Sequence, residues 1–185
     1  STGSYLECQD FWRLSGIERD VFLYSQPKVA VKDFRVISTL DDSYTDGIFK
    51  LAVDVRNHAL AGKKMQVFYE LIDKVSGKVA VNGVSDCEVK SSETQTVTFN
   101  ASLPGVKTWT SEAPNLYKLL ITLKEGNEVT EIIPFNVGFR RIEIKAIDQI
   151  AKNGKPYVVL LINGQPLKLK GVNIHEHNEE TCLLY

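Results

Sequence analysis

The segment "IFKLAVDVRN" at residues 48–57 decides which fold to expect. Apolar side chains occupy every second position, at Phe49, Leu51, Val53 and Val55. Charged side chains stand between them, at Lys50, Asp54 and Arg56. Successive side chains of a β-strand point to opposite faces, so the segment predicts a strand with one buried face and one exposed face.

The neighbouring segments repeat this pattern between residues 27 and 137. Residues 28–40 and 94–103 alternate, and residues 63–73 place Met65, Val67, Tyr69 and Leu71 on one face. The intervening "DDSYTDG" supplies turn residues and a glycine, Gly47, for a positive φ, and Glu125-Gly126-Asn127 predicts a hairpin. About seven strands with regular turns and no helical period predict an all-β fold, an immunoglobulin-like antiparallel β-sandwich.

The composition excludes some classes of partner. The chain of 185 residues has a net charge of −1, with 43% hydrophobic and 24% charged residues. Such a balance gives no electrostatic reason to expect a nucleic acid or an acidic membrane as partner. No apolar run approaches the roughly 20 residues needed to span a bilayer. We therefore expect neither nucleic-acid nor membrane binding.

The two ends differ from the middle. Residues 1–25 are too few to fold alone, yet they carry Phe11, Trp12 and Ile17, which predicts that they pack either against the rest of this chain or against a missing neighbouring domain. The chain has no initiating Met and stops at the apolar "TCLLY", so we expect a fragment of a longer protein.

Residues 153–162, "NGKPYVVLLI", and residues 163–172, "NGQPLKLKGV", are near-copies. Each combines an Asn-Gly-x-Pro turn with a β-rich run. Either an internal duplication or two consecutive hairpins accounts for this repeat.

The cysteines and histidines are candidate ligands. Cys8, Cys87 and Cys182 are widely spaced and form no C-x-x-C pair, which argues against disulfides and structural zinc and favours reduced thiols. His175 and His177 would share one face of a strand, where they could bind a metal, hydrogen-bond a ligand or serve only as structural residues. We expect His58, which follows a strand, in an exposed loop.

The acids near the start, Glu7, Asp10, Glu18 and Asp20, form no recognisable catalytic pair. Glycoside hydrolysis needs two carboxyl groups about 5 to 9 Å apart, and a sequence does not give this distance. Arg13 and Arg19 could pair with these acids in a salt-bridge cluster at the end of a domain. On composition and periodicity alone, the chain is a binding or structural sandwich.

Three segments together resemble a known family. Residues 3–27 are similar to the chain that leaves the sugar-binding jelly roll in β-galactosidases of glycoside hydrolase family 2. Residues 108–123 resemble that family's W-[ST]-x-E-x-P-N-L-Y segment. Residues 137–144 and 160–178 resemble its V-G-F-R…N-G-x-P…G-V-N-R-H-E-H pattern at the start of the (β/α)₈ barrel.

The resemblance implies three parts: residues 1–25 as the tail of the jelly roll, residues 26–137 as the immunoglobulin-like domain, and residues 138–185 as the leading hairpin and first strand of the catalytic barrel. The β-galactosidases of the family are retaining enzymes that hydrolyse terminal β-galactosides with two glutamates. Both glutamates are expected beyond Tyr185, so no catalytic residue is expected in this chain and Glu176 is neither of them.

The resemblance assigns two site residues. Asp10 matches the aspartate that holds a sodium ion near the galactose 6-hydroxyl, and His175 matches a histidine that hydrogen-bonds the sugar. For the longer enzyme it implies a β-galactoside substrate, Na⁺ and Mg²⁺, and a homo-oligomer; this chain alone is expected to require no cofactor.

Three positions depart from the family pattern: Glu18 replaces the usual Phe, Ile174 the usual Arg, and Cys182 a common Gly. These departures keep β-glucuronidase and β-mannosidase open as sister activities. We therefore hypothesise a non-catalytic central piece of a β-galactosidase, in which residues 5–24 form both a packed domain edge and, through Asp10, a site rim. The alternative is a stand-alone carbohydrate-binding or adhesive module.

Overall fold

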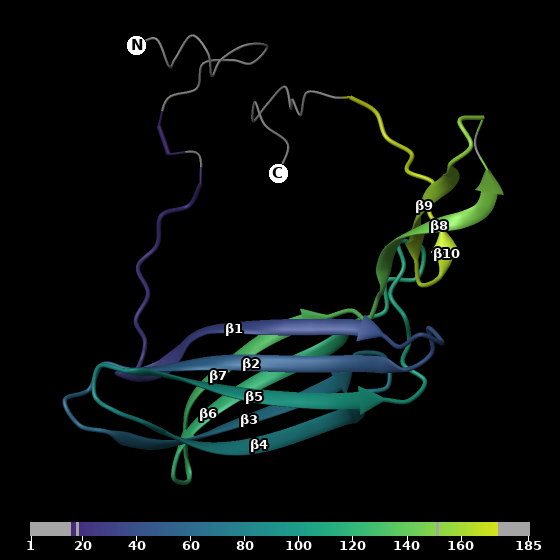
Figure 1. Ribbon diagram of the computed structural model, residues 1–185. Coiled ribbons are helices and arrows are strands. Elements are labelled where there is room, and N and C mark those ends of the chain that lie inside the picture. Colours follow the sequence, from purple (N-terminus) through teal and green to yellow (C-terminus); the bar gives the residue numbers. More distant parts are fainter. Residues whose placement is uncertain (1–15, 18, 151, 174–185) are drawn as a thin grey trace.

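The computed structural model describes residues 16–17, 19–150 and 152–173, and these residues form strands and no helix. Seven strands make two antiparallel sheets that face each other (Figure 1). The first sheet has the order β1-β2-β5: Val29–Leu40, Gly47–Asn57 and Thr94–Leu103. The second has the order β4-β3-β6-β7: Val79–Val89, Lys63–Asp73, Tyr117–Glu125 and Glu128–Val137. The predicted all-β antiparallel sandwich is confirmed.

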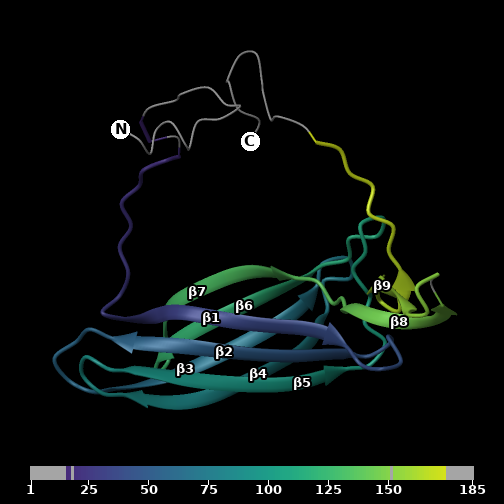
Figure 2. The ribbon, with the colours of Figure 1, turned by 45° about the horizontal axis from the view of Figure 1, so that its top comes forward.

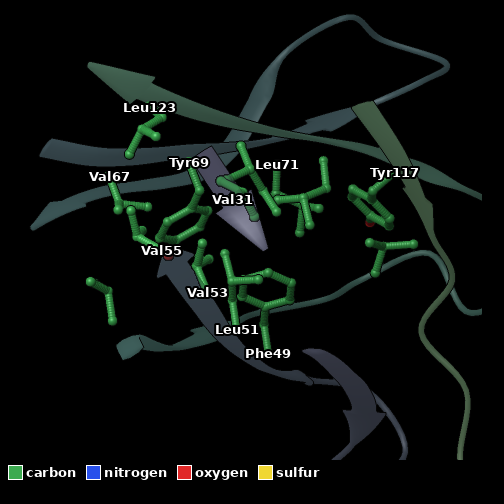
Figure 3. Packing of buried hydrophobic residues seen from close by; sticks show 14 of the residues in the cluster. Val31, Phe49, Leu51, Val53, Val55, Val67, Tyr69, Leu71, Tyr117 and Leu123 are labelled. Atoms are coloured by element: carbon green, nitrogen blue, oxygen red, sulfur yellow. The ribbon is translucent and has the colours of Figure 1, made fainter. Parts of the chain in front are cut away.

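The core lies between the two sheets and consists of the alternating side chains. The predicted inward faces of β2 and β3 are confirmed, because Phe49, Val53, Val67 and Leu71 are fully buried (Figure 3). Aromatic rings link the layers: the ring centroids of Phe49 and Tyr69 lie 5.5 Å apart. Burial of these apolar side chains is the main favourable contribution to folding.

The turn between β1 and β2 differs from the prediction. Gly47 does not adopt a positive φ; Tyr44 does, at 60°. Gly47 is needed for space instead, since a Cβ there would lie 2.7 Å from Val106 Cγ1 and 2.8 Å from Phe139 Cδ1. The prediction assigned the glycine to backbone conformation, whereas packing requires it.

One open side of the sandwich is closed by a carboxylate. Glu131 on β7 accepts a hydrogen bond of 2.7 Å from the backbone N–H of Val31, at the bulge of β1, and another of 3.2 Å from Gln26. The contact joins the edge strands of the two sheets and satisfies an edge N–H group that would otherwise be open to pairing.

A third, small sheet follows the sandwich. It has the order β10-β9-β8, formed by Gln165–Pro166, Pro156–Ile162 and Ile142–Ile150. It stands beyond the end of the sandwich at which β1 ends and β2 begins (Figure 2). Both Asn-Gly turns lie between paired strands, so consecutive hairpins account for the repeat. The run after the second turn forms only the two-residue β10, which is shorter than expected.

The described part of the N-terminal segment does not pack on the sandwich. Ile17 is 80% exposed and Phe22 is 75% exposed, so the predicted packing of Ile17 does not occur within the described part of this chain, and packing against a neighbouring domain stays a prediction. Phe11 and Trp12 lie outside the described residues. His58 is exposed after β2, as predicted, and Cys87 is a half-buried free thiol. Within the described ranges, nothing helical is long and apolar enough to cross a membrane.

Candidate functional site: the junction of the sandwich and the third sheet

The two predicted site residues, Asp10 and His175, lie outside the described residues, as do Glu176 and His177. Among residues 16–17, 19–150 and 152–173, no three histidine, cysteine, aspartate or glutamate side chains group in a way that could hold a metal ion. The division at residues 25 and 137 stays a prediction. The polar structure that can be described lies where the sandwich meets the third sheet.

Two of the segments singled out in the sequence meet at this junction. The N–H of Trp109 donates to the carbonyl of Phe139 at 2.8 Å, and Thr108 pairs with Phe139 in a parallel bridge. The guanidinium of Arg140 lies over the Trp109 ring, 4.6 Å from its centroid. Gly138 lets the backbone pass this ring, because a Cβ there would be 3.1 Å from it. Residues 108–117, the tryptophan segment, therefore support the chain that leaves β7.

The tryptophan segment is itself held by local hydrogen bonds. The amide of Asn115 donates to the Thr108 carbonyl at 2.9 Å, and the hydroxyl of Thr110 accepts from the N–H of Ala113 at 2.9 Å. Below it, Tyr117 and the fully buried Phe139 stack edge to face with centroids 5.3 Å apart. Asn115 and Thr110 thus fix the bends of the loop, and Tyr117 anchors its end in the core.

Asn163 links the third sheet to this loop. Its side chain accepts from the N–H of Arg141 at 2.9 Å and donates to the carbonyl of Trp109 at 3.1 Å. Its own N–H donates to the Arg141 carbonyl at 2.8 Å. Asn163 has φ 49°, a conformation that asparagine tolerates better than most residues. One residue thus joins β8, the turn before β10 and the tryptophan segment.

A second set of contacts centres on Tyr44, in the loop between β1 and β2. Its hydroxyl donates to Glu143 Oε2 at 2.7 Å and accepts from Lys145 Nζ at 2.9 Å. Arg141 pairs with Asp42 at 2.7 Å and with Glu143 at 2.9 Å. The hydrogen bond from Tyr44, with the neighbouring cations Lys145 and Arg141, holds the pKa of Glu143 below its usual range.

An open pocket of about 460 Å³ lies beside the contact of Trp109 with Gly138 and Arg140. Its walls include Val36, Trp109, Phe135 and Ile142, and Ser38 at its edge donates to the carbonyl of Gly138 at 2.9 Å. The lining combines apolar surface with a guanidinium, and its described residues provide no pair of carboxyl groups for glycoside hydrolysis. The contacts at the junction join the sandwich to the third sheet.

The sequence did not predict the Tyr44 contacts. Tyr44 and Glu143 are 99 residues apart, and no local pattern connects a turn tyrosine with a glutamate in a later strand. The Asn163-Gly164 turn was recognised, but its side-chain contact with Trp109 was not. A signal did exist for Asn163, because Asn-Gly marks a tight turn whose asparagine side chain often bonds to nearby backbone.

Comparison with known proteins agrees with this architecture. The sequence profile of "Glycosyl hydrolases family 2" matches residues 29–140, more than half of the chain. A β-galactosidase of Priestia megaterium is 36% identical over 177 residues, and one of Streptococcus thermophilus is 36% identical over 185 residues. These alignments cover 95% and 98% of this chain but 16% of each relative, so the chain spans about a sixth of their length.

Solved structures show the same fold at lower sequence identity. A family 2 glycosyl hydrolase of Bacteroides cellulosilyticus superposes with a TM-score of 0.67 and 18% identity, covering 82% of this chain and 19% of that one. A putative β-galactosidase of Bacteroides fragilis gives 0.65 and 20%, covering 78% and 20%. Strand content, sheet arrangement and sequence similarity agree: the chain belongs to family 2 of the glycosyl hydrolases.

Proposed function

We propose that this chain is the central part of a longer retaining glycosidase that hydrolyses terminal β-D-galactosides. The observation that carries the proposal is the 36% identity to proteins named β-galactosidase over 95–98% of the chain. Both catalytic glutamates then lie beyond Tyr185. In this proposal the described strands position the barrel and do not contact the bond that breaks.

The path of the chain supports a shared role for its ends. Residues 19–27 and residues 167–173 leave the body of the protein on the same side (Figures 1 and 2). The first segment follows Asp10 in the sequence and the second precedes His175. A common exit side fits a function in which both residues contact one galactoside.

Each of the two residues has a physical role in the proposal. A carboxylate is a hard ligand, so Asp10 suits a sodium ion beside the sugar 6-hydroxyl. A neutral imidazole at His175 donates a hydrogen bond that strengthens as charge develops on the sugar ring. Mg²⁺ and assembly into a homo-oligomer belong to the same proposal for the longer enzyme.

The first experiment measures substrate preference of the enzyme encoded by the complete gene. Chromogenic β-galactoside, β-glucuronide and β-mannoside are compared by kcat/KM at equal enzyme concentration. We expect the galactoside to be preferred by at least ~10-fold. Preference for the glucuronide or mannoside would place the enzyme among the sister activities and reject the galactosidase proposal.

The assigned residues are tested in that enzyme. We expect Asp10→Ala and His175→Ala each to lower kcat/KM by ~100-fold or more, about 2.7 kcal/mol of transition-state stabilisation. Removing Na⁺ should slow the wild type and leave Asp10→Ala unaffected. His58→Ala, in an exposed loop, is the control and should retain full activity. Losses below threefold at Asp10 and His175 would contradict their assignment.

A further inference from the structure

Tyr44 adopts an unfavourable backbone conformation. Its φ of 60° lies in the left-handed region, which costs a non-glycine residue free energy. The loop is built to hold it there: Asp41 accepts hydrogen bonds from the N–H groups of Thr45 and Asp46, at 3.1 and 3.0 Å. The Asp41 carbonyl accepts from the N–H of Tyr44 at 3.2 Å. The sandwich thus presents the Tyr44 side chain from a preformed loop.

The Tyr44 side chain contacts two separate elements of the third sheet. Its hydroxyl bonds to Glu143 and Lys145, which are both on β8. Its ring lies against Gly164, in the turn between β9 and β10, where an added Cβ would be 2.7 Å from the ring. Because Gly164 has φ 76°, this turn also depends on glycine. Tyr44 therefore touches the first strand of the sheet and its last turn.

The contact surface around the ring is charged in a complementary way. The Arg141 guanidinium and the Lys145 ammonium lie 5.5 and 5.6 Å from the ring centroid. Both cations also pair with Glu143, at 2.9 and 3.0 Å. The Tyr44 hydroxyl, the Glu143 carboxylate and the two cations thus satisfy one another. Removing the hydroxyl takes one hydrogen-bond donor from Glu143 and one acceptor from Lys145.

These contacts supply a second point of attachment for the sheet. The first consists of the connection at residues 138–141 and the Asn163–Trp109 hydrogen bond. A sheet held by one set of contacts can rotate about it, whereas a further set that includes Glu143 and Lys145 on β8 restricts that rotation. The segment at residues 167–173, which leads to His175, continues directly from β10. Any rotation of the sheet is transmitted to the start of that segment.

We infer that Tyr44 is a positioning residue: its hydroxyl fixes the orientation of the third sheet and, in the whole enzyme, improves the alignment of His175 with the sugar. The second half of this inference rests on the function proposed above. The first half concerns this chain alone and is tested separately.

The first test is hydrogen exchange of the 185-residue chain with Tyr44→Phe, which keeps the ring and removes only the hydroxyl. We expect amide exchange in β8 and β9 to rise at least ~10-fold, with β2 and β3 unchanged. Tyr157→Phe is the matched control, since Tyr157 is half exposed on β9 of the same sheet. Unchanged exchange in β8 and β9 would overturn the inference, whatever the enzyme does.

The second test is a double-mutant cycle in the whole enzyme. We expect Tyr44→Phe to lower kcat for a chromogenic β-galactoside by ~10-fold with KM changed less than twofold, because misalignment of a contact made in the transition state affects the chemical step. In a His175→Ala background the same change should cost less than twofold. Additive losses would overturn the route through His175, and absence of any glycosidase activity would reject the proposed function while leaving the exchange result to decide the positioning role.

Discussion

Gly47 begins β2 where the backbone passes the side chains of Val106 and Phe139. A Cβ at this position would lie 2.7 Å from Val106 and 2.8 Å from Phe139, closer than real contacts allow. Phe139 is fully buried and Tyr117 stacks on it, so its ring has little room to move. The residue thus sets how closely the first strand pair approaches the end of β7.

We predict that Gly47→Ala lowers the free energy of unfolding by about 1–3 kcal/mol, the usual cost of overpacking a core. Urea denaturation of the 185-residue chain measures it. Gly62→Ala is the matched control, because a Cβ there meets its neighbours at an ordinary 3.8 Å; we expect a change within about 0.5 kcal/mol. Equal stability of the two variants would show that the side chains around Gly47 move aside for the added methyl group at no cost in stability.

At the scale of elements, the turn between β3 and β4 is tied to the loop after β5. Asp73, the last residue of β3, accepts from the N–H groups of Val75 and Ser76 at 2.8 and 3.2 Å. Lys107 donates to its other oxygen at 2.7 Å. The hydrogen bond from Lys107, followed by those from the turn, lowers the pKa of Asp73 to about 2. The ionised carboxylate therefore joins two connections at one end of the sandwich.

This shift predicts a pH dependence of stability. Since the folded-state pKa lies below the ordinary value of 3.8, Asp73 stabilises the fold above about pH 4, and this contribution is lost as the pH falls from about 4 to 2. We expect the difference in unfolding free energy between wild type and Asp73→Asn to shrink over that range. Lys107→Gln should remove part of the same dependence. Parallel stability curves for wild type and Asp73→Asn would contradict the assignment.

The predictable elements are those whose inward side chains are large and apolar. The faces of β2 and β3 follow from alternation alone. The strand β4 has no such signal, because its partly buried positions include Gly83 and Ser85. The Tyr69 ring fills the space above Gly83, where a Cβ would lie 2.6 Å from it. A small residue opposite a large one packs well but leaves the alternation undetectable in the sequence.

The junction was less predictable than the sandwich for a related reason. The motifs around Trp109 and Asn163 could be recognised separately, but only the fold brings them within hydrogen-bond distance. The predicted residues Asp10 and His175 rest on the family resemblance alone. Sequence periodicity reports which side chains are buried, whereas a binding residue is defined by partners that lie far away in the chain.

At the scale of the whole molecule, the proposal that this chain positions the barrel without supplying catalytic residues predicts that it is inactive by itself. We expect no turnover of a chromogenic β-galactoside, because both proposed catalytic glutamates lie beyond Tyr185. Calorimetric titration with galactose and lactose should likewise give no binding at millimolar concentration. Hydrolysis that Asp10→Ala abolishes would contradict the proposal, and millimolar or tighter sugar binding would favour a stand-alone carbohydrate-binding module.

The position of Tyr44 in the chain also has a consequence for synthesis. A ribosome adding roughly 5–20 residues per second needs about 5–20 s to reach Glu143, which lies 99 positions after Tyr44. All seven sandwich strands are translated before that glutamate is. The hydroxyl of Tyr44 therefore gains its carboxylate partner only after every strand of the sandwich has been synthesised, so docking of the third sheet is a late step that follows the sandwich in the order of synthesis.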